Sequence, residues 1–360
     1  MKAFQLRDAK MAKDIIASIK ALDVKMVVMH VCGTHQDTLV RFGLEEMLAD
    51  AGISIRQGPG CPVCVTPPVE IEMALCLARK GKTIAVFGDM SRVPSSSGSL
   101  HEARAAGADV RIVYGVDDAV KFAKEHPKKQ VVFMAIGFET TSPSTASVIA
   151  SEPPKNMTFL SCHRLVPPAL KAIAEMGEVR LDGLIEPGHV SVIIGTKPYE
   201  FLSTQYKLPQ VVAGFEPLDL LMACYMLAKQ KKDGVAKVEN EYSRAVNPEG
   251  NPAALKLLDD IFTVNDAEWR GFGYIAKSAH GLSRRYAHMD ARRVFEDDFA
   301  ELEGKKFGEP KGCKCAEVLR GLMTPRECPM FGKGCRPDSP VGPCMVSAEG
   351  SCNILFRHSK

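Results

Sequence analysis

Short apolar segments alternate with helical patterns through about the first two-thirds of the chain. These segments are rich in Val, Ile and Phe, which are typical strand formers. Strands that alternate with helices form parallel sheets, because each helix carries the chain back to the start of the next strand. The sequence therefore predicts an α/β fold. The expected strands are Met26–Val31, Thr83–Phe87, Val110–Tyr114, Val131–Ile136, Met157–Leu160, Leu184–Ile185 and Val211–Ala213.

The chain has 360 residues, which is too long for one compact hydrophobic core. We expect two α/β domains, residues 1–118 and 119–232, followed by a C-terminal domain, residues 233–360. Residues 234–310 are more polar and are predicted to be mostly helical, with Pro252–Phe262 as the clearest helix. From Gly312 onward, repeated Gly and Pro predict loops. Such a segment buries little apolar area and usually needs a metal or a disulfide for stability.

Charge and hydropathy argue against two classes of partner. The formal net charge is +3 and the basic residues are scattered, so nucleic acid is not expected as a partner. The N-terminal stretch is charged throughout and predicts an amphipathic helix, not a signal peptide. No stretch approaches the roughly 20 apolar residues that a membrane span needs. We therefore expect a cytoplasmic protein whose thiols are mostly kept reduced.

Cysteines are concentrated near the C-terminus. Six of the twelve fall in the last 48 residues, and in a reducing compartment such clustering favours metal ligation or redox chemistry over structural disulfides. Four of these six, separated by 14, 6 and 16 residues, would supply the thiolates of an iron–sulfur cubane. A structural zinc site is the alternative, although the Cys-x-x-Cys pairs of zinc ribbons are missing here. Spacing alone does not choose among the possible sets. The four are Cys313, Cys328, Cys335 and Cys352, and the other two are Cys315 and Cys344.

A Cys-x-x-Cys pair, Cys61 and Cys64, lies in the segment Gly58-Pro-Gly-Cys-Pro-Val-Cys64. The two cysteines are close enough in sequence to form a disulfide or to share a metal. They precede a helix predicted from Val69, whose N-terminal partial charge would favour a thiolate. A structural role as half of a zinc knuckle would need a second pair nearby, and the body of the chain offers none. We therefore predict redox chemistry for this pair.

Further polar residues follow predicted strands directly. Cys32 and His35 follow the first strand and are typical of an activated thiol or a two-ligand metal position. Glu139 and His189 follow two later strands and are candidate acid–base groups or supporting partners. The alternatives are an inert buried cysteine and loop residues satisfied by local hydrogen bonds. In open α/β sheets ligands bind beyond the carboxyl ends of strands, so these loops are expected to line one cleft.

Together these motifs resemble those of the HypD family, the hydrogenase formation proteins. The resemblance spans essentially the whole chain and includes the spacing of the C-terminal cysteines. The matching segments are Cys32-Gly-Thr-His-Gln-Asp-Thr38, Gly58-Pro-Gly-Cys-Pro-Val-Cys-Val-Thr-Pro67, Gly137-Phe-Glu-Thr-Thr141, Pro187-Gly-His-Val-Ser191 and Gly214-Phe-Glu-Pro217.

The resemblance implies two parallel-sheet α/β domains flanking a cleft, with a mostly helical and loop-rich C-terminal iron–sulfur domain. It implies a redox-active assembly scaffold more than a turnover enzyme, which builds the Fe(CN)2CO unit of [NiFe]-hydrogenases with a HypC-type chaperone. A HypE-type protein, supplied with its carbamoyl precursor by HypF, would deliver cyanide. Cys32 would help hold the transient iron, Cys61 and Cys64 would form a redox-active dithiol, and a [4Fe-4S] cluster would be bound. The implied cluster ligands are Cys313, Cys328, Cys335 and Cys352.

Two other functions use the same residues. A thiol–disulfide oxidoreductase would pass electrons from the cluster to protein disulfides and would bind no mononuclear iron. An interaction protein with zinc in its tail would contain neither a cluster nor a redox role. Infrared bands of cyanide and carbonyl would separate the first from the scaffold, and metal and sulfide analysis would separate the second.

Overall fold

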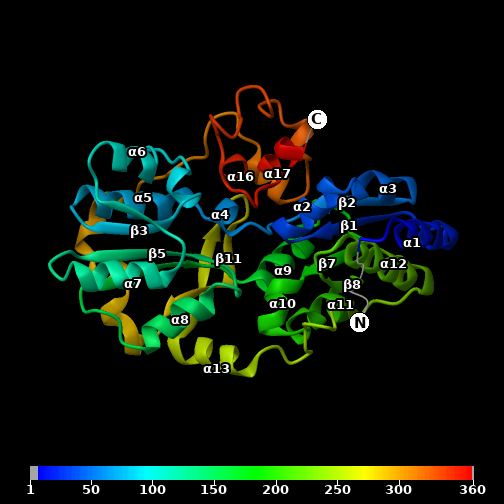
Figure 1. Ribbon diagram of the computed structural model, residues 1–360, viewed down its shortest axis with the longest axis horizontal. Coiled ribbons are helices and arrows are strands. Elements are labelled where there is room, and N and C mark those ends of the chain that lie inside the picture. The colour runs from blue at the N-terminus through cyan, green and yellow to red at the C-terminus, as the bar shows by residue number, and fades with distance from the viewer. Residues whose placement is uncertain (1–6, 359–360) are drawn as a thin grey trace.

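The computed structural model describes residues 7–358, which form two parallel β-sheets side by side with helices packed around them (Figure 1). Sheet 1 has the strand order β2-β1-β7-β8-β9, and sheet 2 has the order β4-β3-β5-β6. Every neighbouring pair within these two sheets is parallel. The strands of sheet 1 are β1 (Met26–His30), β2 (Ile53–Gln57), β7 (Gly183–Pro187), β8 (Gln210–Ala213) and β9 (Val238–Asn240). Those of sheet 2 are β3 (Thr83–Phe87), β4 (Val110–Val113), β5 (Val131–Gly137) and β6 (Met157–His163).

The predicted α/β fold with parallel sheets is confirmed. All seven predicted strands are present, with their ends shifted by at most three residues. Every residue of β5 and β6 is buried, which explains why these strands are continuous apolar runs instead of alternating ones. β2 was not predicted, because its sequence Ile-Ser-Ile-Arg-Gln is largely polar and one of its five residues is exposed.

Helices connect the strands and cover the sheets. In the first half of the chain they are α1 (Ala9–Leu22), α2 (Gly33–Arg41), α3 (Leu44–Asp50), α4 (Pro62–Val65), α5 (Pro68–Arg79), α6 (Leu100–Ala105), α7 (Val116–Glu125), α8 (Ser142–Ala150) and α9 (Val166–Met176). They continue with α10 (Gly188–Ile194), α11 (Glu200–Tyr206), α12 (Pro217–Asp233), α13 (Pro252–Ile261), α14 (Ala291–Val294), α15 (Cys315–Leu319), α16 (Pro343–Val346) and α17 (Ser351–His358). No helix within residues 7–358 is long and apolar enough to cross a bilayer.

The strands of the two sheets are not separated at residue 118, the predicted boundary between the two α/β domains. The chain starts sheet 1 with β1 and β2, builds all of sheet 2, and then returns to sheet 1 with β7. The return places β7 beside β1, with Met29 opposite Leu184. An apolar run marks a strand but does not say which strand pairs with it, so this interleaving was not readable from the sequence.

Residues 234–310 are not mostly helical, which corrects the prediction. They do contain the expected helix, α13, but they also contain β9 and an antiparallel hairpin, β10 (Phe262–Trp269) and β11 (Gly273–Leu282). Four consecutive residues of β10 are exposed, so its sequence lacks an apolar run. The hairpin is held by main-chain pairing and by burial of Trp269 near its turn.

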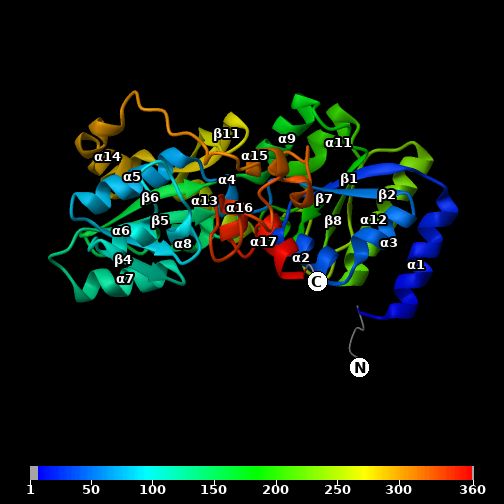
Figure 2. The same cartoon turned by 90° about the horizontal axis from the view of Figure 1, so that it is seen from above.

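The C-terminal segment, from Gly312 onward, packs over the junction between the half of the molecule built on sheet 1 and the half built on sheet 2 (Figures 1 and 2). It contains α15, α16 and α17 joined by loops, as the Gly and Pro content predicted. α17 packs against α2 of the sheet 1 half, whereas α15 and α16 pack against α4. The segment therefore brings the last cysteines next to the loops that follow β1 and β2.

Candidate functional site

Cys32 follows β1 and is the N-cap residue of α2, with 8% of its surface exposed. Burial raises the pKa of its thiol to about 11. Two glycines let other segments approach the cysteine closely. A Cβ on Gly60 would lie 2.6 Å from the Cα of Cys32, and a Cβ on Gly33 would lie 2.7 Å from the Cβ of Glu349. The Cys32 loop is therefore packed between the Cys61–Cys64 segment and the C-terminal segment.

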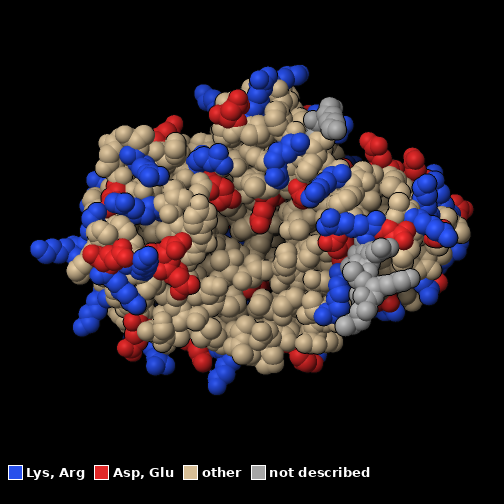
Figure 3. Space-filling view, viewed as in Figure 1, with Lys and Arg blue, Asp and Glu red and all other residues tan. Residues whose placement is uncertain are grey.

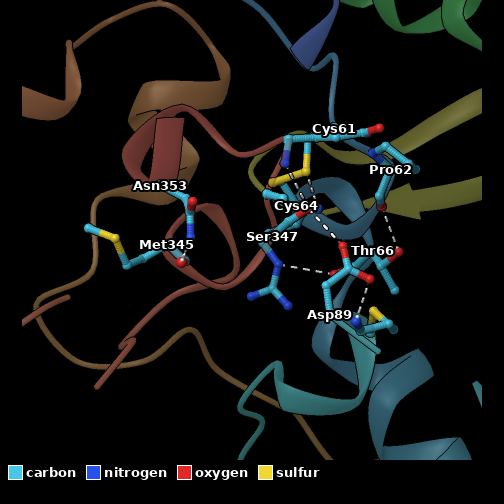
Figure 4. Close-up of a disulfide and its surroundings, with 12 residues drawn as sticks. Cys61, Pro62, Cys64, Thr66, Asp89, Met345, Ser347 and Asn353 are labelled. Carbon is cyan, nitrogen blue, oxygen red and sulfur yellow. Dashed lines mark hydrogen bonds between the residues drawn. A yellow bond between two sulfur atoms is a disulfide. The ribbon is translucent and has the colours of Figure 1, made fainter. Parts of the chain in front are cut away.

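Cys61 and Cys64 form a disulfide at the start of α4, and both are fully buried. Cys61 is the N-cap residue of α4, and its sulfur accepts a hydrogen bond from the Cys64 N–H at 3.1 Å. Figure 4 shows the C-terminal residues Met345, Ser347 and Asn353 beside the disulfide. The hydroxyl of Ser347 donates to Asp89 at 2.9 Å, and Asp89 lies just after β3. Of the two alternatives for this pair, the structure contains the disulfide.

The six C-terminal cysteines line one small cavity together with apolar side chains such as Met330, Phe331 and Val341. Burial raises the pKa of the Cys352 thiol well above its ordinary value, and four neighbouring cysteines add to the shift. The hydrogen bond that the Cys313 thiol donates to Cys315, together with burial, raises the pKa of Cys313 in the same way. The cysteines that surround Cys352 are Cys313, Cys315, Cys328 and Cys335.

The donor set is of the kind that an iron–sulfur cluster requires. Within residues 7–358, no group of three or more His, Cys, Asp or Glu side chains is arranged to hold a single metal ion. A cubane makes a different demand, because its four thiolates bind four different irons and surround a volume instead of a point. Residue 342 must be a glycine in this wall of the cavity, because a Cβ on it would collide with the sulfur of Cys313. The cavity is lined by more than the four thiols that a cluster requires.

His35 is fully buried and lies under the loop after β8. Its Nε2 is 3.3 Å from the carbonyl oxygen of Ala213, and burial lowers the pKa of the ring to about 3. The ring also packs against Phe215, with the centroids 5.2 Å apart. The exposed His189 also stacks on Phe215, with the centroids 3.8 Å apart, and partial burial lowers the pKa of His189. Phe215 thus joins the two predicted histidines in one stack.

Glu139 is buried in the loop after β5. Its carboxylate accepts hydrogen bonds from the Val166 N–H at 3.0 and 3.3 Å. Burial nevertheless raises the pKa of Glu139 to about 8. Glu186, in β7, is also buried, and neither of its oxygens has a hydrogen-bond partner among the described residues. Burial raises its pKa to about 8 as well, so both side chains are mostly neutral acids at pH 7.

Tyr199 is close enough to Glu139 and Glu186 for their charges to affect it. Burial raises the pKa of its hydroxyl well above the ordinary value, and negative charge on Glu186, Glu139 or Cys32 would raise it further. The hydroxyl is 3.2 Å from the Ser191 oxygen. Loops from both sheets therefore meet around Tyr199. Figure 3 shows a hollow between the two halves of the molecule, with acidic side chains visible inside it.

The structure thus brings together Cys32, the disulfide, the C-terminal cysteines and Glu139, and it places His189 at an exposed edge. Sequence reasoning missed Glu186 and Tyr199 as members of this group. Glu186 could have been found, because an acidic residue at the end of a fully buried strand is unusual. Tyr199 carries no local signal, since a tyrosine between two short helices is ordinary.

Comparison with known proteins identifies the family. The HypD family model, described as "Hydrogenase formation hypA family", matches residues 9–359. A protein of Methanocaldococcus jannaschii named for hydrogenase expression and formation is 46% identical over 98% of this chain and 97% of its own length. The hydrogenase maturation factors HypD of Cupriavidus necator and Azotobacter vinelandii are 41% and 42% identical, each over 99% of this chain and 96% of their own length. The chain therefore belongs to the HypD family of hydrogenase maturation factors.

Proposed function

We propose that this protein is the scaffold on which the Fe(CN)2CO unit of [NiFe]-hydrogenases is assembled, in the cytoplasm and in complex with a HypC-type chaperone. The observation that supports it most is the packing of the Cys61–Cys64 segment and the C-terminal segment on the two sides of the Cys32 loop. One thiol, one disulfide and a ring of thiols are thereby gathered from distant parts of the chain. A site that binds iron and moves electrons requires such a group.

In this proposal Cys32 is the protein ligand of the cargo iron. Its thiol is protonated in the buried site, so iron binding must release that proton. The neutral acids Glu139 and Glu186 are suited to donate protons near the cargo, because they are mostly protonated at pH 7. Tyr199 is close enough to feel the charge of both acids, and its hydroxyl, 3.2 Å from the Ser191 oxygen, can donate or accept a hydrogen bond.

The reduced Cys61–Cys64 dithiol is the proposed two-electron donor, and the disulfide is its oxidised form. Transfer of cyanide from a HypE-type donor breaks a bond between sulfur and carbon, and release of the donor thiol consumes two electrons and one proton. As it closes to the disulfide, the reduced Cys61–Cys64 pair can supply the two electrons and this proton, and its second proton is released. A [4Fe-4S] cluster, when bound by Cys313, Cys328, Cys335 and Cys352, would supply one-electron chemistry beside this pair.

Infrared spectroscopy of the purified complex tests the proposal. With the unchanged chain, co-expressed with its chaperone and cyanide donor, we expect cyanide and carbonyl stretching bands. The variants Cys32→Ala and Cys61→Ala should lose these bands, whereas Cys224→Ala should keep them, since Cys224 is packed in α12 beneath sheet 1. Full bands in either site variant would contradict the proposal.

A thiol–disulfide oxidoreductase that acts on other proteins is less well supported. Cys61 and Cys64 are both 0% exposed, and α16 of the C-terminal segment packs against α4 beside them (Figure 4). A protein thiol must approach along the axis of the S–S bond, and here no open face is presented to it. The burial favours exchange with small molecules or with groups inside the site.

A further inference from the structure

Arg270 lies in the turn of the β10–β11 hairpin, and its side chain is 0% exposed. Its backbone N–H donates to the Val65 carbonyl at 2.8 Å, and its Nε donates to the Thr66 carbonyl at 3.0 Å. Val65 is the last residue of α4, directly after Cys64. The guanidinium therefore binds the C-terminal end of the short helix that carries the disulfide.

The same turn packs against α15. A Cβ on Gly271 would lie 2.9 Å from the Cα of Ala316, the residue after Cys315, and the φ angle of Gly271 is +84°. Burial raises the pKa of the Cys315 thiol, and the positive charge of Arg270 acts in the opposite direction. Arg270 acts on Cys344 in the same sense. Arg270 thus stands between the disulfide helix and the cavity of the C-terminal cysteines.

The charge of Arg270 is only partly compensated. Its Nη1 pairs with Glu309, whose side chain is 38% exposed at the rim. Its Nη2 is buried and has no hydrogen-bond partner within residues 7–358. A buried guanidinium with a free N–H is costly unless an anion is nearby. Besides its partner Glu309, the groups near Arg270 that can become anions include Cys64, which directly precedes Val65 in α4.

We propose that Arg270 is a positioning residue whose buried positive charge favours the reduced form of the Cys61–Cys64 pair. Reduction by two glutathione molecules breaks the S–S bond and gives one protein thiol, one protein thiolate, one glutathione disulfide and one released proton. The thiolate is the only new charge on the protein in this exchange, and a buried cation beside α4 stabilises it. The inference rests on the dithiol role proposed above.

Three variants of the full-length protein test the inference. Arg270→Met removes the charge and keeps much of the volume, whereas Glu309→Gln frees the guanidinium from its partner. Lys314→Met removes an exposed cation beside the same cysteine cavity, with a side chain that is 42% exposed. Each protein is equilibrated without oxygen in glutathione buffers, alkylated, and analysed by the mass of the peptide that contains Cys61 and Cys64.

The expected shifts have opposite signs. Arg270→Met should make the pair about tenfold harder to reduce, which is about 30 mV for a two-electron couple. Glu309→Gln should make it easier to reduce, and Lys314→Met should change the equilibrium less than about twofold because water screens its charge. A purely structural role for Arg270 would not produce the shift in Glu309→Gln.

The outcomes separate the two proposals. If the pair exchanges reversibly with glutathione but neither Arg270→Met nor Glu309→Gln shifts the equilibrium, the inference about Arg270 is wrong and the dithiol role stands. A pair that stays oxidised in every buffer would overturn both. Should Arg270→Met fail to fold, as circular dichroism would show, the sign of the Glu309→Gln shift decides.

Discussion

Burial raises the pKa of both Glu139 and Glu186 to about 8, so folding favours the neutral form of these two acids. Glu139 has partial compensation, because the Val166 N–H donates to its carboxylate. Glu186 has no such donor in the described part of the chain, and burial alone accounts for its raised pKa. Stability should therefore depend on pH through Glu186.

Glu186→Gln should make the protein more stable than the unchanged chain at pH 8. The folded-state pKa of about 8 lies above the ordinary value of 4.5, so the neutral acid contributes stability that is fully present below about pH 4.5. This contribution is lost as pH rises through 8, and glutamine lacks it. Denaturant unfolding should show a difference of roughly 1–3 kcal/mol at pH 8 that shrinks toward pH 4.5.

The exposed Glu125 in α7 provides the control. Glu125→Gln should leave the pH dependence of the unfolding free energy unchanged. A constant offset between Glu186→Gln and the unchanged chain across the whole pH range would show that folding does not shift the pKa of Glu186.

Some residues of the site could be predicted from the sequence and others could not. Cys61 and Cys64 were found from their Cys-x-x-Cys spacing ahead of a predicted helix, and Cys32 was found because it follows a predicted strand and precedes His35 by three residues. The rule that loops at strand ends converge then predicted that Cys32 and Glu139 would share a cleft. Arg270 was beyond reach, because its meaning depends on the turn of a hairpin that the polar sequence of β10 did not reveal. His35 was expected at a reactive position, and the structure instead places its ring against Ala213 and Phe215.

At the scale of elements, the loop between β2 and α4 depends on a close backbone approach. Gly60 lies directly over Cys32, and a Cβ there would collide with backbone atoms that cannot move aside as a side chain can. The strands were predictable because burial on both faces selects Val, Ile and Leu. The contact of Gly60 with Cys32 was not predictable, because a glycine in a Pro-Gly-Cys segment is equally well explained by turn geometry alone.

Gly60→Ala should therefore destabilise the protein by about 1–3 kcal/mol, the range typical of overpacking. Gly115→Ala is the matched control, because no atom lies within 4 Å of a Cβ at that position. Thermal unfolding of both variants measures the effect. Equal melting temperatures would mean that the two loops are not packed as described.

At the scale of the whole molecule, one hydrophobic cluster crosses between the halves. It contains Met29, Leu184 and Val212 from sheet 1 together with Ile84 and Val132 from sheet 2. The interleaved connections add a covalent constraint, because sheet 1 is formed by strands from before and after sheet 2. The halves are therefore expected to unfold together.

Trp269, the only tryptophan in the chain, reports on this cooperativity. It is buried near the hairpin turn and stacks on Phe138, which follows β5 of sheet 2. Denaturation followed by Trp269 fluorescence and by far-ultraviolet circular dichroism should give coincident midpoints. An early loss of part of the dichroism, with the fluorescence unchanged, would show that sheet 1 unfolds separately.

The pairing of β1 with β7 also has a consequence for synthesis of the chain. A ribosome adding about 5–20 residues per second reaches β7 roughly 8–30 s after it has made β1. Sheet 2 can form in that interval from contiguous sequence, whereas β1 must wait for β7, and the covering helices α15, α16 and α17 emerge later still. On the nascent chain, Cys61 and Cys64 are thus open to protein thiols until these helices have emerged and docked beside them.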